Sequence, residues 1–207
     1  MALNEQTIDW HEQWALFAPN FHNGLAHIVL SNSCRFPLKP GAGFGDLSHP
    51  TTQLMLNLLK QTDVPKHLCD IGCGSGILSI AAAYLGCQNI IGFDIDEKAL
   101  EHSKENAKLN QLEHMIQFFH PERFEGFLST EMILMNMIME EQKIAWEQVK
   151  KSLSSDNPIK IMTSGILKEQ RQDYLKWSKS QGWKLIKTQT KEKWQGFLFS
   201  YHLLGKD

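Results

Sequence analysis

The hydrophobic pattern changes at about residue 51, and from there apolar β-like runs alternate with helical segments. The runs that we predict as strands cover residues 67–71, 89–94, 115–119, 131–137 and 158–163, and the predicted helices cover 51–61, 76–86, 97–110, 140–153 and 168–181. Alternation of this kind implies parallel strands joined by right-handed crossovers. The expected fold class is therefore α/β, with a Rossmann-like sheet and helices on both of its faces.

The two ends of the chain depart from that alternation. Two β-rich runs, 183–190 and 194–202, are joined by the short polar link 191–193, which predicts an antiparallel C-terminal hairpin. At the other end, residues 1–39 carry Trp10, Trp14, Phe17, Phe21 and Phe36, with a predicted helix at 9–16 and β-like pieces at 26–30 and 33–38. We expect this aromatic-rich arm to pack on a catalytic domain that spans residues 40–207, as a fixed element or as a lid or substrate groove.

Composition limits the classes of protein that fit this pattern. The chain has 207 residues, of which 42% are hydrophobic, and a formal net charge of −2, so it can bury one core and has no bulk attraction for nucleic acid or an anionic membrane. Cys34, Cys69, Cys73 and Cys87 show no paired spacing, which indicates reduced core residues. Without a basic leader or an apolar run of about 20 residues, the chain is expected to be cytoplasmic.

The most informative segment follows the first strand after residue 51. Leu68–Leu78 is an apolar run that breaks into alternate glycines at Gly72, Gly74 and Gly76 and then resumes as an apolar, alanine-rich helix. Glycines this close together let the backbone approach a ligand without interference from Cβ atoms. A strand, a tight glycine loop and a helix start together predict a nucleotide pocket.

The spacing within the loop narrows the type of nucleotide. A dinucleotide fingerprint would need its third glycine at position 77, where the chain has Ile77, and a P-loop would need a lysine after the glycines. No lysine or arginine lies between Lys66 and Lys98, so no cation nearby in sequence would neutralise a pyrophosphate. A ligand that has adenosine but no phosphate fits the loop better.

Two acids follow the next apolar strand, and we assign them different roles. Asp94 stands at the carboxyl end of that strand, where an acid is placed to accept both ribose hydroxyls. Asp96 directly precedes a predicted helix and is expected to be its N-cap. The alternative is that both acids only cap the helix.

The motif D-x-G-x-G-x-G over residues 70–76, followed by the acid at 94, resembles the first two motifs of class I S-adenosylmethionine-dependent methyltransferases. The segment 40–52, PGAGFGDLSHPTT, is similar to the more specific P-G-x-A-F-G-T-G-x-H-P-T-T segment of the PrmA family, which methylates a ribosomal protein. Shorter similar segments follow in PrmA order at 95–99, 105–110, 135–138, 164–170 and 193–194. The resemblance extends over about residues 8 to 203.

This resemblance implies a seven-stranded class I methyltransferase sheet and S-adenosyl-L-methionine as the cofactor. The residues that it places at the cofactor are Thr52, Asp70, Gly72, Gly74, Gly76, Asp94 and Asn136. PrmA proteins carry an additional amino-terminal domain that holds the ribosomal protein, and we expect this chain to begin near the linker that would follow it. The chain departs from the family at Asp46, which replaces a threonine, and at Leu47, which replaces a glycine.

Methyl transfer from a sulfonium is an in-line displacement, which needs alignment and a deprotonated nucleophile and needs neither a triad nor a metal. Asn136 ends the strand predicted at 131–137, at the sheet edge where open α/β sheets bind ligands. Its neutral side chain could hydrogen-bond an amine in its nucleophilic form, so Asn136 is the main catalytic candidate. The alternative is that it only caps the following turn.

The glycine-rich segment 40–52 contains two polar residues, Asp46 and His49, whose roles the sequence leaves undecided. If Asp46 faces the pocket, it would attract a cationic substrate or the sulfonium, and if it faces solvent it has no special role. His49 precedes Pro50 and has no identifiable acidic partner, so we expect it to order its loop and not to act as a base. The remaining histidines show no metal-ligand spacing, and no metal site is expected.

The leading hypothesis is a methyltransferase that acts on a protein amine, either a lysine or an N-terminal amine, with a ribosomal protein as the first candidate partner by resemblance. A small molecule or an RNA base as acceptor, and a cofactor-binding protein without turnover, remain as alternatives. The near-neutral charge argues against a nucleic-acid partner, and no membrane partner is expected. The oligomeric state and the number of methyl groups transferred do not follow from the sequence.

Overall fold

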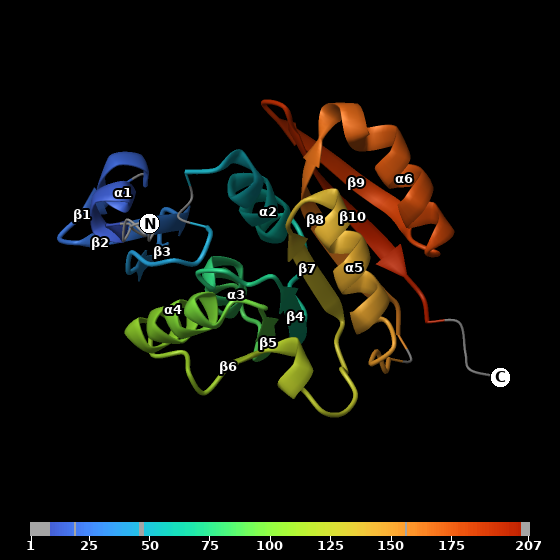
Figure 1. Cartoon of the computed structure of the whole chain (residues 1–207), viewed down its shortest axis with the longest axis horizontal. Helices are drawn as coiled ribbons and strands as arrows, with labels where there is room; N and C mark the ends of the chain where they lie inside the picture. The colour runs from blue at the N-terminus through green and yellow to red at the C-terminus, as the bar shows by residue number, and fades with distance from the viewer. Residues whose placement is uncertain (1–8, 19, 46–47, 156, 204–207) are drawn as a thin grey trace, which may run out of the picture.

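A computed structural model describes residues 9–18, 20–45, 48–155 and 157–203 (Figure 1). Its helices are α1 (Trp10–Phe17), α2 (Pro50–Lys60), α3 (Ile77–Tyr84), α4 (Glu97–Leu109), α5 (Met139–Val149) and α6 (Arg171–Ser180), with 3-10 turns η1 (Pro121–Arg123) and η2 (Lys168–Gln170). Its strands are β1 (Phe21–His22), β2 (Leu25–Ser31), β3 (Cys34–Leu38), β4 (His67–Ile71), β5 (Asn89–Phe93), β6 (Ile116–Phe119), β7 (Met132–Asn136), β8 (Ile159–Leu167), β9 (Lys184–Lys191) and β10 (Trp194–Tyr201).

The main sheet has seven strands in the order β6-β5-β4-β7-β8-β10-β9. The strands from β6 to β8 pair in parallel, and β10 runs antiparallel to both β8 and β9. The predicted α/β fold, the seven-stranded sheet and the C-terminal antiparallel hairpin are therefore confirmed. The chain leaves β4 toward β5 and β6 and later returns beside β4 as β7, so the strand order reverses between β4 and β7.

Alternating side chains of the strands divide the core between the two faces of the sheet. Leu68, Leu134 and Met162 belong to one cluster, together with buried side chains of α2, α3 and α4. The neighbouring positions Cys69 and Ile133 belong to a second cluster with α5 and α6. Because successive side chains of a strand point to opposite faces, the two clusters cover the sheet from both sides.

Most predicted elements agree with the structure to within a few residues, and the largest differences lie in the C-terminal half. Strand β8 continues to Leu167, beyond the predicted end at residue 163, because it pairs with β10 along its whole length. Gly165 is the extra residue at a register shift in that pairing and has a φ of +95°. Helix α5 ends at Val149, short of the predicted 153, because the chain then turns to pair Leu153 with Leu128.

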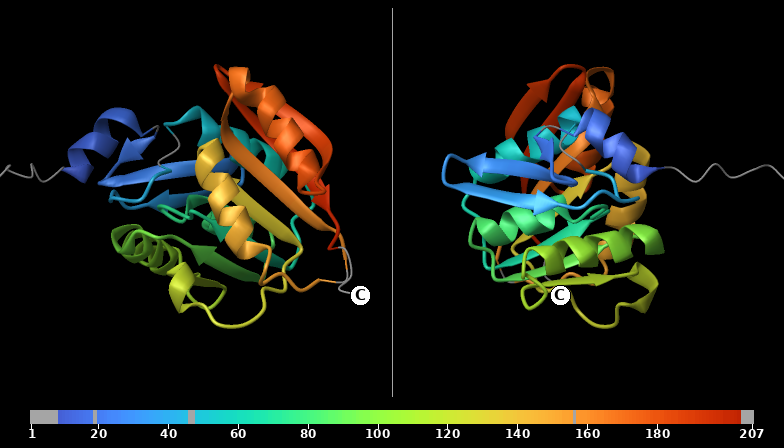
Figure 2. Two further views of the ribbon diagram at one scale, coloured as in Figure 1. Left: turned by 45° about the vertical axis from the view of Figure 1, so that its right-hand side comes forward. Right: turned by 90° about the vertical axis from the view of Figure 1, so that its left-hand side faces the viewer.

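The N-terminal part forms helix α1 and a small sheet of β1, β2 and β3 at the opposite end of the molecule from the β9–β10 hairpin (Figures 1 and 2). Strand β1 was not predicted from the sequence. The side chain of Asn110 at the end of α4 donates a hydrogen bond to the carbonyl of Pro37 in β3 at 2.9 Å, and Trp14 of α1 packs edge to face on His102 of α4. The boundary between an arm over 1–39 and a catalytic domain over 40–207 stays a prediction.

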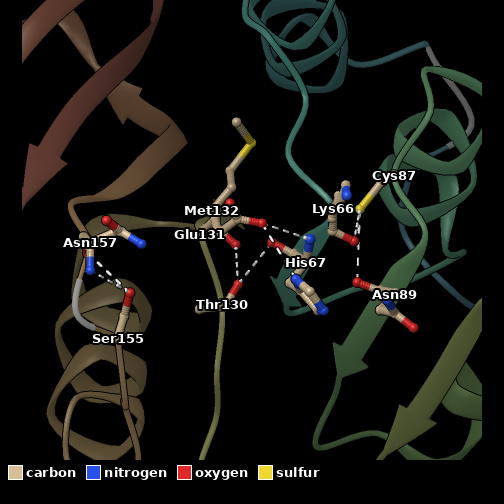
Figure 3. Close-up of polar contacts among 9 residues, drawn as sticks. All are labelled: Lys66, His67, Cys87, Asn89, Thr130, Glu131, Met132, Ser155 and Asn157. Carbon is tan, nitrogen blue, oxygen red and sulfur yellow. Dashed lines mark hydrogen bonds and ion pairs between the residues drawn. The ribbon is translucent and has the colours of Figure 1, made fainter.

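The amino ends of β4, β5 and β7 are fastened to one another by polar contacts (Figure 3). The backbone N–H of His67 donates to the Glu131 carboxylate at 3.2 Å, and the thiol of Cys87 lies 3.4 Å from the carbonyl of Lys66. The hydroxyl of Thr130 lies within hydrogen-bond distance of the carbonyls of His67 and Met132. These contacts fix the strand starts, and the loops at the opposite, carboxyl edge remain for ligand binding.

Candidate active site

A cavity of about 820 Å³ opens at the carboxyl edge of the sheet, where the strand order reverses between β4 and β7. Open α/β sheets bind their ligands at such a switch point. Gly72 and Gly74 from the loop after β4 line it, together with Asp94 after β5 and Asn136 at the end of β7. Ile144 of α5 and Trp194 of β10, which come later in the chain, also line the cavity. A volume of this size is ordinary for a small-molecule site.

The glycine loop after β4 has the backbone geometry that only glycine adopts readily. Gly74 has a φ of +55°, and a Cβ placed on it would lie 2.5 Å from the carbonyl oxygen of Phe44. The loop begins with the N–H groups of Gly72 and Cys73, which donate to the carbonyl of Phe93 at 2.8 and 2.9 Å. These two hydrogen bonds attach the turn to the end of β5, and Gly72 and Gly74 of the turn line the cavity.

The two acids after β5 make different contacts, and the predicted N-cap role of Asp96 is confirmed. One carboxylate oxygen of Asp94 accepts the backbone N–H of Gly74 at 2.9 Å, and the other accepts the N–H of Asp96 at 3.0 Å. Asp96 is the N-cap of α4, with its carboxylate accepting the N–H of Lys98 at 2.9 Å. Asp94 thus faces the cavity from a fixed position, and each of its oxygens keeps acceptor capacity for a ligand hydroxyl.

A second glycine-containing loop, residues 39–45, covers the first from outside the sheet. The N–H of Ser75 donates to the carbonyl of Phe44 at 2.9 Å, and its hydroxyl donates to the carbonyl of Gly45 at 2.9 Å. A Cβ on Gly43 would lie 2.5 Å from the carbonyl carbon of Gly74, so the two loops touch backbone to backbone. Asp46 and Leu47, for which open roles were predicted, lie outside the described residues.

Three of the predicted cofactor residues lie behind the cavity wall. Thr52 is fully buried in α2, and its hydroxyl lies 3.4 Å from the Asn136 side-chain nitrogen. Gly76 caps α3 with a φ of +80°, and a Cβ on it would lie 3.2 Å from Ser103 of α4. Thr52 therefore contacts a residue that lines the cavity, and Gly76 begins the helix that follows the glycine loop.

Asp70 is the third of these and is almost fully buried in β4. One of its carboxylate oxygens accepts the hydroxyl of Ser79 at 2.7 Å, and the other has no partner among the described residues. Burial raises the pKa of Asp70 to about 6, against which the hydrogen bond from Ser79 acts only in part. The strand under the glycine loop therefore holds a carboxyl group that is costly to ionise.

Asn136 lies across the cavity from Asp94 at the end of β7. Its side-chain oxygen is buried and has no hydrogen-bond partner within the part of the chain that the structure describes. Buried amide oxygens are nearly always paired in folded proteins, so an unpaired one in a residue that lines the cavity is a candidate acceptor for a hydrogen bond from a ligand. An N–H group of an incoming amine would satisfy it.

A buried polar network fixes the loop that follows Asn136. The Gln142 side-chain amide of α5 donates to the carbonyls of Met137 and Ser164 at 2.7 and 2.8 Å, and its oxygen accepts the hydroxyl of Tyr174 at 2.6 Å. Gly165 of β8 lies so close that a Cβ on it would overlap the Met137 carbonyl oxygen. Sequence reasoning missed this support because its parts come from three distant segments.

Aromatic rings form one side of the cavity mouth. His49 caps α2, with its ring nitrogen 2.8 Å from the Thr51 hydroxyl, and its ring packs edge to face on Phe44 at 5.4 Å and on Trp194 at 5.2 Å. The cap agrees with the predicted loop-ordering role of His49. Trp194 and Phe44 lie in segments that resembled the PrmA family, and that resemblance was the available signal for their place at the site.

Among the described residues, no group of three or more histidine, cysteine or acidic side chains could hold a metal ion. Across the same ranges, no helix is long and apolar enough to cross a membrane.

Comparisons with known proteins give consistent matches. The family model for ribosomal protein L11 methyltransferase (PrmA) matches residues 21–201. The ribosomal protein L11 methyltransferase of Vibrio campbellii is 33% identical over 80% of this chain, and that of Shewanella sp. strain ANA-3 is 35% identical over 68%. The chain spans 58% and 49% of the length of these two relatives. The solved structure of a ribosomal protein L11 methylase from Lactobacillus delbrueckii subsp. bulgaricus matches with a TM-score of 0.72 and 25% identity, over 85% of this chain and 99% of its own.

Proposed function

Because the chain belongs to the PrmA family of ribosomal protein L11 methyltransferases, we propose that it transfers methyl groups from S-adenosyl-L-methionine to an amine of a protein. The first candidate acceptor is ribosomal protein L11, because the names of this chain's relatives give L11 as their substrate. A lysine side chain and an N-terminal amine are both acceptors of the required chemistry.

One observation carries this proposal. A single cavity has Gly72, Gly74 and Asp94 on one wall and, on the other, Asn136, whose buried side-chain oxygen has no partner among the described residues. The first wall offers backbone and a carboxylate to a nucleoside, and the second offers an acceptor to an amine. A transferase needs both functions to face the same space, and this cavity supports both.

The residues proposed to hold the cofactor are Gly72, Gly74 and Asp94, which line the cavity, with Thr52, Asp70 and Gly76 behind them. Asn136, which the resemblance also placed at the cofactor, is proposed to act on the acceptor amine instead. When bound, S-adenosylmethionine would supply a methyl group activated by the positive charge on its sulfur. Asp94 would accept the ribose hydroxyls, because each of its oxygens already receives one backbone N–H and has further acceptor capacity. The fit rests on Gly72, Gly74 and Asp94, which line the same cavity and offer backbone and a carboxylate to a nucleoside.

Asn136 is the candidate catalytic residue. Its amide oxygen would accept an N–H of the acceptor amine and so orient the nitrogen lone pair toward the methyl donor. Alignment of this kind is worth about 7–11 kcal/mol in well-oriented intramolecular reactions. Since an amide is not a base, the amine must arrive deprotonated, and the rate should rise with pH toward the pKa of that amine.

Two measurements test the proposal. Calorimetry with S-adenosylmethionine should give a saturable heat of binding, and tritiated methyl groups should pass to purified ribosomal protein L11. Asn136→Ala should retain cofactor binding and lower the transfer rate by about tenfold to a thousandfold, the range typical of a removed transition-state contact. Asn157→Ala is the matched control, because this exposed asparagine lies at the opposite, amino edge of the sheet (Figure 3).

The other outcomes identify the alternatives. Label that enters a protease-resistant, nuclease-sensitive fraction of a cell lysate would make an RNA base the acceptor, and label in the small-molecule fraction would make it a metabolite. Binding without transfer to any fraction would indicate a cofactor-binding protein without turnover. Failure to bind S-adenosylmethionine at all would overturn the proposal.

A further inference from the structure

We propose that His102 of α4, which has no place in the motifs of the cofactor site, is a positioning residue that holds the cofactor-binding loops in shape and does so only with a neutral ring. This inference rests on the proposed function, because it concerns the loops that would bind S-adenosylmethionine. It extends that function by making cofactor affinity depend on the protonation of one side chain outside the cavity.

Both ring nitrogens of His102 are engaged by the backbone of the 39–45 loop. The backbone N–H of Gly43 lies 3.0 Å from Nδ1, and Nε2 lies 2.6 Å from the carbonyl oxygen of Lys39. An amide N–H can only donate and a carbonyl can only accept, so Nδ1 must be the acceptor and Nε2 must carry the hydrogen. The contacts thus select the neutral Nε2–H tautomer.

The ring is enclosed by the loop that it holds. His102 is 5% exposed, and a Cβ placed on Gly41 would lie 2.5 Å from its Cδ2 atom. Trp14 of α1 packs edge to face on the other side, with ring centroids 5.7 Å apart. The loop backbone therefore lies directly against the imidazole, and water has little access to replace a lost hydrogen bond.

The loop transmits the position of His102 to the glycine loop. Gly43, which donates to the ring, touches the backbone of Gly74, and the next residues, Phe44 and Gly45, accept both hydrogen bonds from Ser75. Gly74 in turn donates to Asp94. The imidazole of His102 is therefore connected through the backbone of Gly43 and Gly74 to the carboxylate of Asp94, which is proposed to bind ribose.

One turn further along α4, Asn106 strengthens the same connection. Its side-chain oxygen accepts the N–H of Lys39 at 2.7 Å, and its side-chain nitrogen donates to the carbonyl of Ser75 at 3.0 Å. Residues four apart lie on one face of a helix, so His102 and Asn106 present adjacent polar groups to the two loops. Asn106 does not titrate, which leaves His102 as the pH-dependent member of the pair.

Protonation would place a hydrogen on Nδ1, opposite the N–H of Gly43, and would replace an attraction by a repulsion. Burial lowers the pKa of His102 below its ordinary value, which keeps the ring neutral at physiological pH. The charged groups that act on the ring are Glu105 of α4 and Lys39 of the loop, which pair with each other at 2.8 Å, and α1 presents the uncharged Trp14. The loop contact should therefore be complete at neutral pH and be lost as the pH falls through that lowered pKa.

The binding test uses S-adenosylhomocysteine, three proteins and a matched control. In the wild-type protein, affinity should fall by about tenfold as the pH is lowered from about 8 to below the pKa of His102, as expected when one buried hydrogen bond is lost. His102→Gln can still accept from Gly43 and donate to Lys39 but does not titrate, so it should bind within about threefold of wild type at pH 8 and lose the His102 part of the pH dependence. His102→Leu should bind about tenfold more weakly at pH 8. His114→Gln, which changes an exposed histidine in the turn between α4 and β6, should behave as wild type.

The difference between the wild-type and His102→Gln profiles isolates the ring, since Asp70 titrates near pH 6 in both proteins. Identical profiles would overturn the proposal. A second readout needs no ligand: long-range nitrogen–proton NMR spectra of the free protein should show His102 as the Nε2–H tautomer, and the Gly43 amide signal should move at the pH where the ring titrates. An Nδ1–H tautomer, or a Gly43 signal indifferent to that titration, would also overturn it. Failure of wild type to bind at pH 8 would instead count against the proposed function, and the NMR result would still decide the role of His102.

Discussion

The two walls of the cavity are built in different ways. The wall that carries Gly74 and Asp94 is made of backbone: its shape comes from positive φ angles and from N–H and carbonyl groups that bond one another. The wall that carries Asn136 is made of side chains, because Gln142 and Tyr174 reach from two helices to hold the loop after β7. A backbone wall leaves a trace in local sequence, whereas a side-chain wall depends on residues far apart in the chain.

The largest effect on the side-chain wall is expected from a single added methyl group, at Gly165. Gly165→Ala would bring a Cβ into overlap with the Met137 carbonyl oxygen at a φ of +95°, so we expect a loss of about 3–5 kcal/mol in the free energy of unfolding. Urea denaturation measures it. Gly86→Ala is the matched control, because Gly86 has a φ of +105° but nothing within 4 Å of its Cβ position. Backbone strain alone should lower its free energy of unfolding by only about 1–2 kcal/mol. Equal losses would show that Met137 does not confine Gly165.

Removal of the buried amide should also affect this wall, but more selectively. Gln142→Leu leaves the carbonyls of Met137 and Ser164 without their donor, which should cost about 2–3 kcal/mol of stability. The methyl-transfer rate should fall with S-adenosylhomocysteine affinity unchanged, since Gln142 itself donates no hydrogen bond to the glycine loop or to Asp94. Gln172→Leu, an exposed position on α6, serves as control. A loss of cofactor affinity equal to the loss of rate would mean that the two walls are not independent.

Beneath the backbone wall lies the buried carboxyl group of Asp70, and the pH dependence of the free energy of unfolding measures how much its ionisation destabilises the fold. The pKa of Asp70 is raised in the folded protein to about 6, above the ordinary value near 3.9 of the unfolded chain, so the native state binds more protons between these values. Its contribution to stability is complete below about pH 4 and is lost as the pH rises through about 6. Asp70→Asn should therefore be about 3 kcal/mol more stable than wild type at pH 8, and most of the gain should vanish near pH 4.

Chemical denaturation at several pH values tests this expectation, with the exposed Asp63→Asn as the matched control. A gain in stability that does not change with pH would show that Asp70 is not the titrating group.

The sequence allowed the backbone wall to be predicted almost completely. Alternate glycines and a strand-end acid identified Gly72, Gly74 and Asp94, all of which line the cavity, because a strained turn requires a particular residue type at a particular spacing. The same reasoning reached Asn136 through its place at a strand end. It could not reach Gln142 or Tyr174, since a glutamine on a charged helix and a tyrosine on another show no local sign that they meet.

The strand that carries Gly165 shows a second limit. The predicted end at residue 163 took the small residues after it as a loop, but pairing with β10 carries β8 on to Leu167, across a register shift. Long-range pairing decided this boundary, and it placed Gly165 beside Met137. His102 likewise belongs to none of the motifs in the sequence, and only the fold brings the backbone of the 39–45 loop onto its ring.

The most direct test of the two-wall account compares Asp94→Ala with Asn136→Ala in parallel calorimetry with S-adenosylhomocysteine and methyl-transfer assays. Asp94→Ala should weaken binding by more than about tenfold, because the ribose would lose charge-assisted hydrogen bonds, and Asn136→Ala should bind normally but transfer slowly. Asp63→Ala should match wild type in both assays. Unchanged affinity in Asp94→Ala would reassign the ribose to Asp96, and weakened affinity in Asn136→Ala equal to that in Asp94→Ala would contradict the division of the cavity into a cofactor wall and an acceptor wall.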